Sequence, residues 1–581
     1  MVIRLSLLSL IVFMAIGYKL HVSNLLPLKT FGENQYYDRA DIYRKYLAAI
    51  FLWLTPFSMA AAGFFSSFGR MNRIVDRFIE VWNKLPRWFF FIVIPLLFTV
   101  WAAWTAYDLI GRVPWVFDAF NYHFQARNFA LKQFYAQEPP LSELFKFPFI
   151  IIENGKWYGS VYPGYSILLA LGVKLGCDWM INPILGGIGL VLMYFTAGAM
   201  FGESQARLVS FFGLISPFYR MMSSIFMAHA SGIVWVVLTI WMLWLWSQKG
   251  RNVSLLVPFL AGFGMGWIYI TRPQIGVITL PLFLLYTVIR VRFPGWGKLI
   301  VFILPLIASI LFLAVYNQQL TGDCFINPRY HVDPGRRLGF GEDLGEPLGN
   351  GRRGGHDFSK GVQNSLLLIN LWNAEMFGFG AAGVLGLLTF VIAYVLIIHW
   401  KKPLPILLGS SIVFNMILYI FYYTPSPNFG PRYFAEIIPA TIFLFVFGIT
   451  DISQRLMTWT KYRVKPVWLI YFHLMMIAVM FFIMLPLHRD HYGILPMKTD
   501  RGEIPEPLES AIILVPPKLY TWNMYTWNSP NLDGNIFLPL KPDVGIQRIQ
   551  RAFPDRDIFC LEKKVKGAET FTLKKIAERR E

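Results

Sequence analysis

Residues 88–127 read WFFFIVIPLLFTVWAAWTAYDLIGRVPWVFDAFNYHFQAR and place a polar helix directly after a membrane-length apolar run. The run from Trp88 to Thr105 has the roughly 18 apolar residues that a transmembrane helix needs. A turn-like stretch at 111–117 follows, and Asp118 then opens an amphipathic helix over 118–127. A carboxylate at this position, just beyond a spanning helix, can reach both a lipid-borne substrate and water.

The composition of the chain is typical of a polytopic membrane protein. Of 581 residues, 55% are apolar, 17% aromatic and only 15% charged. The apolar runs predict about 13 spans, near 3–17, 46–64, 88–106, 182–200, 204–218, 225–246, 254–271, 275–290, 298–317, 379–398, 404–422, 433–450 and 467–486. The run 162–173 could span in place of 206–215 without changing the orientation of the other spans.

Basic residues predict how these spans are oriented, because loops rich in lysine and arginine stay in the cytoplasm. The basic loops contain Arg70, Arg73, Arg77, Lys84, Arg87, Lys249, Arg251, Arg290, Arg292, Lys298, Lys401, Lys402, Arg455, Lys461, Arg463 and Lys465. Placing all of them in the cytoplasm puts the N-terminus inside and the C-terminus outside.

This orientation leaves four segments on the outer face, 107–181, 318–378, 423–432 and 488–581, and they hold nearly all of the unusual polar residues. The formal charge of +19 is then mostly topogenic charge facing the cytoplasm, and we expect no nucleic-acid partner. The sequence has no zinc-type cysteine pairs and no nucleotide-binding glycine loop. We therefore expect no cofactor and recognise no metal site.

The helix that begins at Asp118 carries a polar stripe. Positions 118, 121, 122 and 125 recur at helical spacing, so Asp118, Asn121, Tyr122 and Gln125 are predicted to share one face. Helix capping by Asp118 is the competing structural role. A polar face at the membrane surface contacts either lipid headgroups or a protein cavity.

Two other outer-face stretches are rich in aromatic residues or glycine. Residues 154–165 combine turn signals with Tyr158 and Tyr162, which suit either anchoring at the membrane interface or stacking on a sugar. Residues 335–357 are dense in glycine and contain Arg336, Arg352 and His356. Such a segment predicts a mobile loop that orders over a ligand, or a plain solvated linker.

Two arginines stand at outer helix ends, against the positive-inside bias. Arg272 lies in the sequence Ile270-Thr271-Arg272-Pro273, and Arg432 lies between Pro431 and Tyr433. The planar guanidinium fork suits a phosphate or pyrophosphate, whereas snorkelling to lipid headgroups is the alternative explanation.

The tail 488–581 is predicted to be a small α/β module outside the membrane. Strands are expected at 511–515, 535–538 and 557–561, with a helix near 544–552 and a loose charged end at 563–581. An inert cap is the simplest role for it, and acceptor binding is the alternative.

Several of these motifs, in this order, resemble the GT-C superfamily of membrane glycosyltransferases, in particular bacterial relatives of the protein mannosyltransferases of family 39. Asp118, Tyr122 and Ala126 match the start of the first outer loop in that group, although Ala119 stands where a second acid is common. The motifs that match further along the chain are Gly155, Tyr158, Tyr162, Pro163, Gly164, Ser216-Pro217, Arg272-Pro273, the loop 321–356 and Arg432-Tyr433. The resemblance covers about residues 85–450.

The resemblance implies transfer of a sugar from a polyprenyl-phosphate carrier to an acceptor at the outer, periplasmic face of a bacterial inner membrane. Asp118 would be the catalytic base. The residues implied to bind donor or acceptor are Asn121, Tyr122, Gln125, Tyr158, Tyr162, Arg272, Arg336, Arg352, His356 and Arg432. Relatives differ in whether they need a divalent metal, so the resemblance leaves metal dependence open.

We therefore expect an all-α polytopic membrane protein with a small C-terminal α/β domain. Its parts would be N-terminal helices and a cytoplasmic loop at 1–84, a GT-C-like domain at 85–487 and the outer module at 488–581. The partners would be the lipid-linked donor, membrane lipids and an acceptor that is a protein, a lipid or a glycan. A transporter or flippase of lipid-linked saccharides is the alternative function, and charges buried mid-membrane would favour it.

Overall fold

The computed structural model describes residues 69–292, 295–349, 352–377, 387–426, 429–459, 508, 510–517, 522–541, 544–562 and 572–579. The predicted spans 3–17, 46–64 and 467–486 lie outside the described residues.

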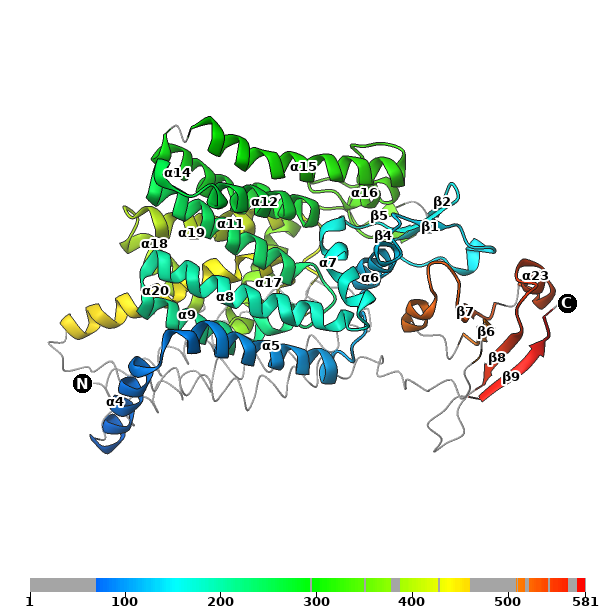
Figure 1. The fold of residues 1–581 in the computed structure, drawn as a ribbon, viewed down its shortest axis with the longest axis horizontal. Helices are drawn as coiled ribbons and strands as arrows, with labels where there is room; N and C mark the ends of the chain where they lie inside the picture. Colours follow the sequence, from blue (N-terminus) through cyan, green and yellow to red (C-terminus); the bar gives the residue numbers. More distant parts are fainter. Residues whose placement is uncertain are drawn as a thin grey trace.

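The described chain is mostly helical, as expected, and its helices run side by side in one bundle (Figure 1). The helices of the bundle are α4 (Gly69–Lys84), α5 (Ile94–Trp104), α7 (Pro163–Lys174), α8 (Ile181–Phe201), α9 (Glu203–Ile215), α10 (Pro217–Met222), α11 (His229–Lys249), α12 (Leu256–Thr271), α13 (Pro273–Thr279), α14 (Pro281–Val291), α15 (Trp296–Thr321), α17 (Phe358–Glu375), α18 (Leu387–Ile398), α19 (Pro403–Leu418) and α20 (Ile438–Trp459). Short π-helical or 3-10 turns extend some of these: η3 (Phe89–Val93) and η4 (Thr105–Leu109) flank α5, η6 (Asp178–Met180) precedes α8, and η10 (Tyr419–Phe421) and η11 (Arg432–Ile437) lie between α19 and α20.

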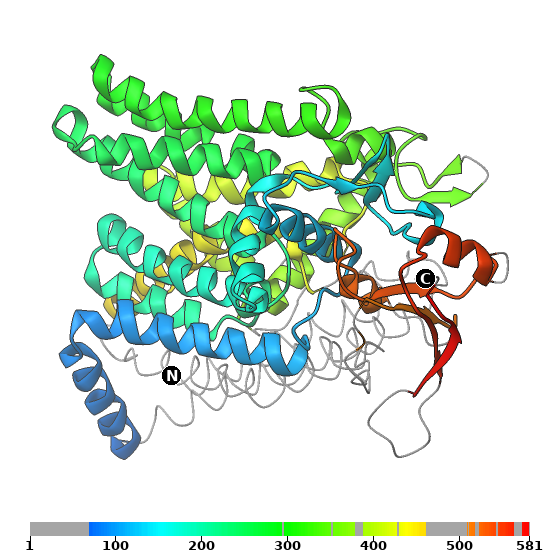
Figure 2. The ribbon, with the colours of Figure 1, turned by 45° about the vertical axis from the view of Figure 1, so that its right-hand side comes forward.

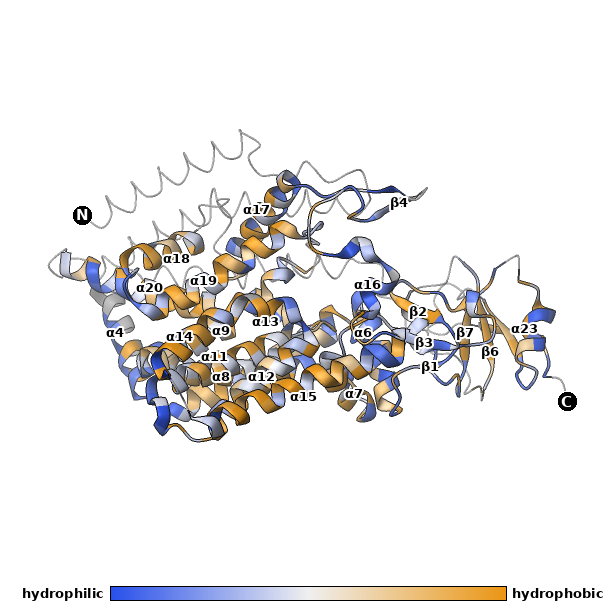
Figure 3. Ribbon diagram, turned by 90° about the horizontal axis from the view of Figure 1, so that it is seen from above, coloured by the Kyte–Doolittle hydropathy of each residue, from blue (hydrophilic) through white to orange (hydrophobic). Residues whose placement is uncertain are grey.

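Six of the helical stretches within the described ranges are long and apolar enough to cross a membrane: Phe89–Leu109, Asp178–Phe201, His229–Asn252, Trp296–Thr321, Pro403–Phe421 and Arg432–Trp459. Each matches a predicted span. Three shorter apolar helices, Leu256–Thr271, Pro281–Val291 and Leu388–Ile398, fall within three further predicted spans. Figure 3 shows the apolar residues along the helices and hydrophilic residues gathered near α4 and around α16 (Pro328–Val332).

Two predicted spans are shorter or broken. The span 204–218 is α9, which has 13 residues and stops before Ser216-Pro217. The span 275–290 is divided into α13 and α14, because Pro281 lacks the amide proton that would continue the first helix. The alternative span at 162–173 corresponds to α7, a helix of 12 residues.

Several outer-face segments lie together at one end of the bundle, away from α4 (Figure 1). Helix α6 (Phe117–Ala130) follows α5 and packs on α7 and on an antiparallel sheet of order β1-β3-β2. The strands of that sheet are β1 (Ala136–Gln137), β2 (Ile150–Glu153) and β3 (Lys156–Gly159), and η5 (Ser142–Leu144) lies between the first two. Helix α16 lies at the same end of the bundle.

The long outer segment 318–378 contains more regular structure than its glycine content predicts. Strands β4 (Pro347–Gly349) and β5 (Arg352–Arg353) form a short hairpin after the turn η8 (Pro334–Arg336). Residues 358–375 then form the 18-residue helix α17, which packs against η10, α18 and α19. This part of the segment is therefore a bundle helix.

The C-terminal module has the predicted α/β character (Figure 2). Strands β6 (Ile512–Val515), β7 (Ile536–Pro539) and β8 (Ile558–Glu562) and helix α23 (Ile546–Ala552) lie where expected. The sheet order is β7-β6-β8-β9, with β6 parallel to both of its neighbours. The expectation of a loose end is wrong for Thr572–Ala577, which forms β9 and pairs antiparallel with β8.

Candidate functional site

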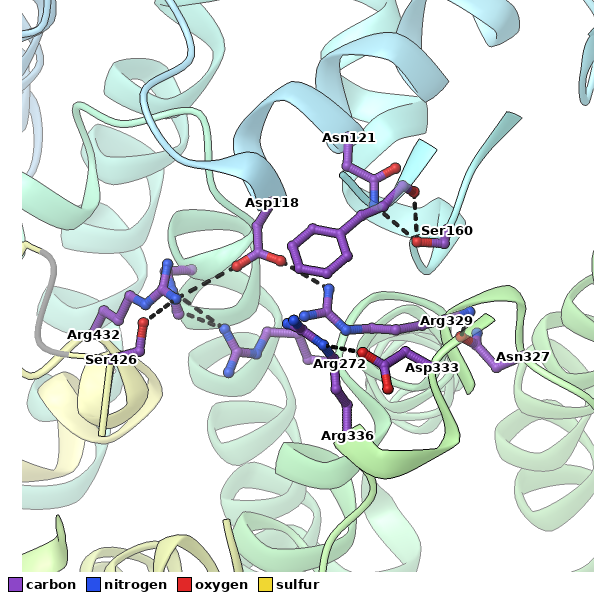
Figure 4. Close-up of polar contacts among 12 residues, drawn as sticks. Asp118, Asn121, Ser160, Arg272, Asn327, Arg329, Asp333, Arg336, Ser426 and Arg432 are labelled. Carbon is purple, nitrogen blue, oxygen red and sulfur yellow. Dashed lines mark hydrogen bonds and ion pairs between the residues drawn. The ribbon is translucent and has the colours of Figure 1, made fainter. Parts of the chain in front are cut away.

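Asp118 lies in the first turn of α6 and does not cap the helix. The N-cap residue is Val116, whose carbonyl accepts the amide protons of Ala119 and Phe120. A carboxylate in the first turn is favoured by the positive end of the helix dipole. The Asp118 side chain is therefore free of a capping role and points at arginines from distant parts of the chain (Figure 4).

Two arginines hold the Asp118 carboxylate. Arg329 in α16 donates from Nη1 to Oδ1 at 2.8 Å, and Arg432 in η11 approaches Oδ2 with Nη2 at 3.4 Å (Figure 4). The Asp118 side chain is 18% exposed. Burial alone would raise the pKa of Asp118, but the two guanidinium groups, with Arg336 nearby, lower it well below its ordinary range. The carboxylate is therefore ionised at all physiological pH values.

Arg432 has two guanidinium nitrogens that make no hydrogen bond to the described residues. Its Nη2 donates to Ser426 Oγ at 2.5 Å, and its guanidinium lies 5.3 Å from the centre of the Tyr433 ring. Its Nε and Nη1 are buried and have no hydrogen-bond partner among the described residues. Buried guanidinium nitrogens without partners cost free energy, which an anion at this position would recover.

Arg272 lies in a second buried ion pair. Its Nε lies 3.2 Å from Glu436 Oε1, Nη2 donates to the Tyr419 hydroxyl at 3.1 Å, and Nη1 lies 2.7 Å from His229 Nδ1. The side chains of Glu436 and His229 are fully buried. Arg272 Nε is within ion-pair distance of Glu436 but makes no hydrogen bond, whereas Arg432 has two such nitrogens, Nε and Nη1.

Arg336 lies beside Arg329 on the outer side of the cluster. Its Nε donates to Asp333 at 2.7 Å and its Nη2 to Glu346 at 2.9 Å. The guanidinium groups of Arg336 and Arg329 lie 4.4 and 4.8 Å from the centre of the Phe149 ring. Phe149 has a φ of +68°, a left-handed conformation that is uncommon for an aromatic residue.

The predicted polar face of α6 divides into two parts. Tyr122 faces the cluster, since Asp118 and Arg272 are among the charges that act on its pKa, which burial raises. Asn121 instead donates to Ser160 Oγ at 3.2 Å, and the Gln125 side chain accepts from the Gly159 amide at 3.0 Å. Asn121 and Gln125 therefore hold α6 against the end of β3. These two residues of the predicted polar face bond to that strand region and do not face the arginine cluster.

The two predicted tyrosines also differ in position. Tyr162 is half-buried, and Tyr122, Tyr330 and Arg329 are among the groups that influence its pKa, which burial raises. Tyr158 is fully buried, and its hydroxyl lies 3.3 Å from Glu153. The structure thus places Tyr162 near the cluster and Tyr158 in the packing behind β3.

Two predicted residues of the glycine-rich segment do not contact Asp118. Arg352 is exposed, whereas its neighbour Arg353 reaches Asp333 at 2.6 Å. Successive strand residues point to opposite faces, so only one of the pair can face inward. His356 is buried, lies 3.0 Å from the Ile420 carbonyl oxygen and stacks near Phe340.

Sequence reasoning missed Arg329 and Glu436 as site residues, whereas His229, near the end of the predicted span 225–246, is a weaker candidate from the sequence. Arg329 is the nearest charge to Asp118, although nothing in its local sequence distinguishes it from other loop arginines. Glu436 offered a signal, because an acid inside a membrane-length apolar run is costly and needs a reason.

The buried ion pairs around Asp118 and Glu436 contain more arginines than carboxylates. Arg272, Arg329 and Arg432 face the two carboxylates of Asp118 and Glu436, which leaves one positive charge in excess. Arginines around the central carboxylate would repel a cation, so these residues do not fit a metal ion. Within the described ranges, no three His, Cys, Asp or Glu residues are grouped to hold one.

No protein-family model matches the chain, and no curated protein matches it in sequence. Among solved structures, the chain is similar to ArnT from Cupriavidus metallidurans, at 12% identity and a TM-score of 0.46 over 81% of this chain and 92% of that one. It is also similar to the Archaeoglobus fulgidus oligosaccharyltransferase, at 12% identity and a TM-score of 0.40 over 77% of this chain. A complex of the archaeal oligosaccharyltransferase AglB with an inhibitory peptide and a dolichol-phosphate matches at 11% identity and a TM-score of 0.38.

The chain spans 64% of the length of the oligosaccharyltransferase that it matches.

Proposed function

We propose that this protein is a membrane glycosyltransferase that moves a sugar from a polyprenyl-phosphate carrier to an acceptor at the outer, periplasmic face of a bacterial inner membrane. The observation that carries the proposal is the contact of Asp118 with two arginines, one of which has two buried nitrogens without partners. The proposed base, Asp118, is therefore in direct contact with the arginines proposed to bind the phosphate. The surplus of one positive charge matches a phosphodiester, which carries one negative charge.

The proposed reaction needs two functions that these residues supply. Asp118 takes the proton of the acceptor hydroxyl while the acceptor oxygen attacks the anomeric carbon. The bond between that carbon and the phosphate oxygen breaks, and the lipid phosphate leaves with its electron pair. Arg432 and Arg329 stabilise the charge that develops on the leaving phosphate.

The ion pairs of Asp118 make its basicity depend on whether the donor is bound. A carboxylate held by two arginines has a lowered pKa and is a weak base. A phosphate that takes the hydrogen bonds of Arg432 and Arg329 releases the carboxylate, and its pKa then rises towards the ordinary value. Donor binding would in this way prepare the base.

Glu436 bears on the alternative function, transport of lipid-linked saccharides. It is a buried charge within an apolar helix, the kind of residue that a transport pathway requires. However, it is paired with Arg272, and it follows Arg432 by four residues at the start of the span. A paired charge at the end of a helix supports the Asp118 site and gives no path through the membrane.

The experiment is sugar transfer by the purified protein in nanodiscs, with a panel of polyprenyl-phosphate sugars and envelope extracts as acceptor source. We compare Arg432→Lys with the matched control Arg352→Lys, which changes an exposed arginine in the same way. Loss of the planar fork at Arg432 should raise the KM for the donor by about 10-fold or more, from the usual strength of a charge-assisted hydrogen bond. The control should behave as wild type.

Equal effects of the two substitutions would contradict the assignment of the phosphate site. Movement of the lipid-linked sugar between leaflets without any transfer would favour the transporter.

A further inference from the structure

The C-terminal module shares a hydrophobic core with the segment that carries Asp118. Buried residues of α6 and the β1–β3 region, including Phe124, Phe147 and Trp157, form one cluster with Leu514 and Tyr525 of the module. These two parts of the chain are separated by more than 350 residues, since Trp157 and Tyr525 lie 368 positions apart.

Tyr525, in the turn η13 (Trp522–Trp527), is at the centre of this contact. Its ring lies 4.4 Å from that of Phe147 and 6.2 Å from that of Phe124, measured between ring centres. Trp157 Nε1 donates to its hydroxyl at 3.1 Å. The Tyr525 side chain is only 3% exposed. Buried aromatic groups of this kind contribute strongly to packing and fix its geometry.

Polar contacts also join the module to α6 and to the β1–β3 region. Arg127, near the end of α6, donates from Nη1 to the Thr526 carbonyl at 2.6 Å. On the far side of the contact, Arg548 of α23 pairs with Glu143 at 2.8 Å. The module therefore contacts the second half of α6, at Phe124 and Arg127.

The two sides of α6 have different partners. Phe120 and Phe124 face the core shared with the module, whereas Asp118 and Tyr122 face the arginine cluster. The arginines that contact Asp118 come from α16 and η11 and not from the module. The other contacts of Arg432, with Ser426 and Tyr433, also lie outside the module. A shift of α6 would therefore move the carboxylate relative to Arg432 and leave Arg432 in place.

We infer that the C-terminal module is a positioning element for the base, and that Tyr525 is the positioning residue through which it acts on Asp118. This inference rests on the proposed function, because it assigns the role of Tyr525 in terms of that reaction. It replaces the expectation of an inert cap.

The test uses three variants of the full-length protein. Tyr525→Leu removes the ring that packs on Phe147, and Tyr525→Phe keeps the ring but removes the hydroxyl. The matched control is Phe559→Leu, which removes a half-buried ring from β8, a strand of the module that pairs with β6 and β9.

Tyr525→Leu should lower kcat about 10-fold to 100-fold, since a displacement of about 1 Å in a catalytic group can cost 100-fold. Its KM for the donor should stay within about threefold of wild type, because Arg432 keeps its contacts with Ser426 and Tyr433. Tyr525→Phe should retain most of the activity, and Phe559→Leu should leave kcat within about threefold.

Hydrogen exchange of the backbone amides in 117–130 gives a readout independent of activity. Tyr525→Leu should accelerate it, and Phe559→Leu should not. If the wild type shows no transfer, this exchange alone decides whether the module holds α6, so that a failure of the proposed function is distinguished from a failure of the inference. If Tyr525→Leu has the kcat and the exchange rate of the wild type, the inference is overturned. Equal losses of kcat in Tyr525→Leu and Phe559→Leu would overturn it as well.

Discussion

Arg272 and Arg432 are expected from the sequence to be equivalent, yet the structure predicts that removing Arg272 destabilises the fold more than removing Arg432. Replacement of Arg272 by Gln leaves Glu436 with His229 as its remaining partner at 3.1 Å. The Glu436 side chain is fully buried, so its charge cannot recover solvation from water.

The magnitude follows from this burial. Breaking a buried ion pair by removing one partner costs about 3–5 kcal/mol, and the contact with His229 places Arg272→Gln near the lower end. For a chain of this size, the melting temperature should fall by roughly 2–3 °C. Arg432→Gln should cost less, because Asp118 retains Arg329 and is partly open to solvent.

The assay is thermal unfolding of the purified variants in the same detergent, followed by intrinsic fluorescence. The double variant Arg272→Gln, Glu436→Gln removes both charges and should recover at least half of the lost stability, because no unpaired charge remains. An Arg272→Gln variant as stable as wild type, or a double variant less stable than the single one, would refute the reasoning.

Two further predictions concern α6. Arg329→Gln should let the pKa of Asp118 rise, because the nearest guanidinium is lost. In the wild type this pKa lies below the value of about 3.9 that Asp has in the unfolded chain. The ion pairs therefore stabilise the fold fully above about pH 3.9, and this stabilisation is lost only as the pH falls through the lowered pKa. The variant should lose stability at higher pH during acid titration followed by fluorescence, and superimposable acid profiles would exclude this linkage. Gly159→Ala would place a methyl group 2.5 Å from Asn121 Oδ1 and 2.9 Å from its backbone oxygen, so α6 must move. We expect a loss of about 1–3 kcal/mol in stability together with reduced transfer, and an alanine variant with unchanged melting temperature and kcat would speak against close packing there.

Hydropathy predicted the bundle well. A segment that crosses the lipid must be helical to satisfy its backbone hydrogen bonds, and it must be apolar along its length, so it appears in the sequence as a continuous apolar run. It failed where proline interrupts such a run. Pro281 divides the predicted span 275–290, and the run still looks continuous when only average hydropathy is counted.

Helical spacing placed Asp118 and Tyr122 on one face. Asp118 contacts the arginine cluster, and the charges of that cluster influence the pKa of Tyr122. Helical spacing could not predict that Asn121 and Gln125 would form hydrogen bonds with the β3 region, because the position of that strand depends on contacts far away in the sequence. A wide polar stripe can serve two neighbours, and spacing alone does not separate them.

The arginines show the same limit. Arg432 is recognisable at the outer end of a helix, but Arg329 is one of several arginines in an irregular loop, and only the fold brings it to Asp118. In the hairpin, adjacent residues alternate in direction, so the choice between Arg352 and Arg353 depends on a register that the sequence does not reveal.

The most direct test of the central claim is sugar transfer by Asp118→Asn beside wild type, with the donor panel described above. Asparagine keeps the shape of the side chain but cannot accept the proton. If Asp118 is the base, turnover should fall by about 100-fold or more while the variant remains folded. Turnover equal to that of wild type would contradict the account, because Asp118 would then only balance the charge of Arg329 and Arg432.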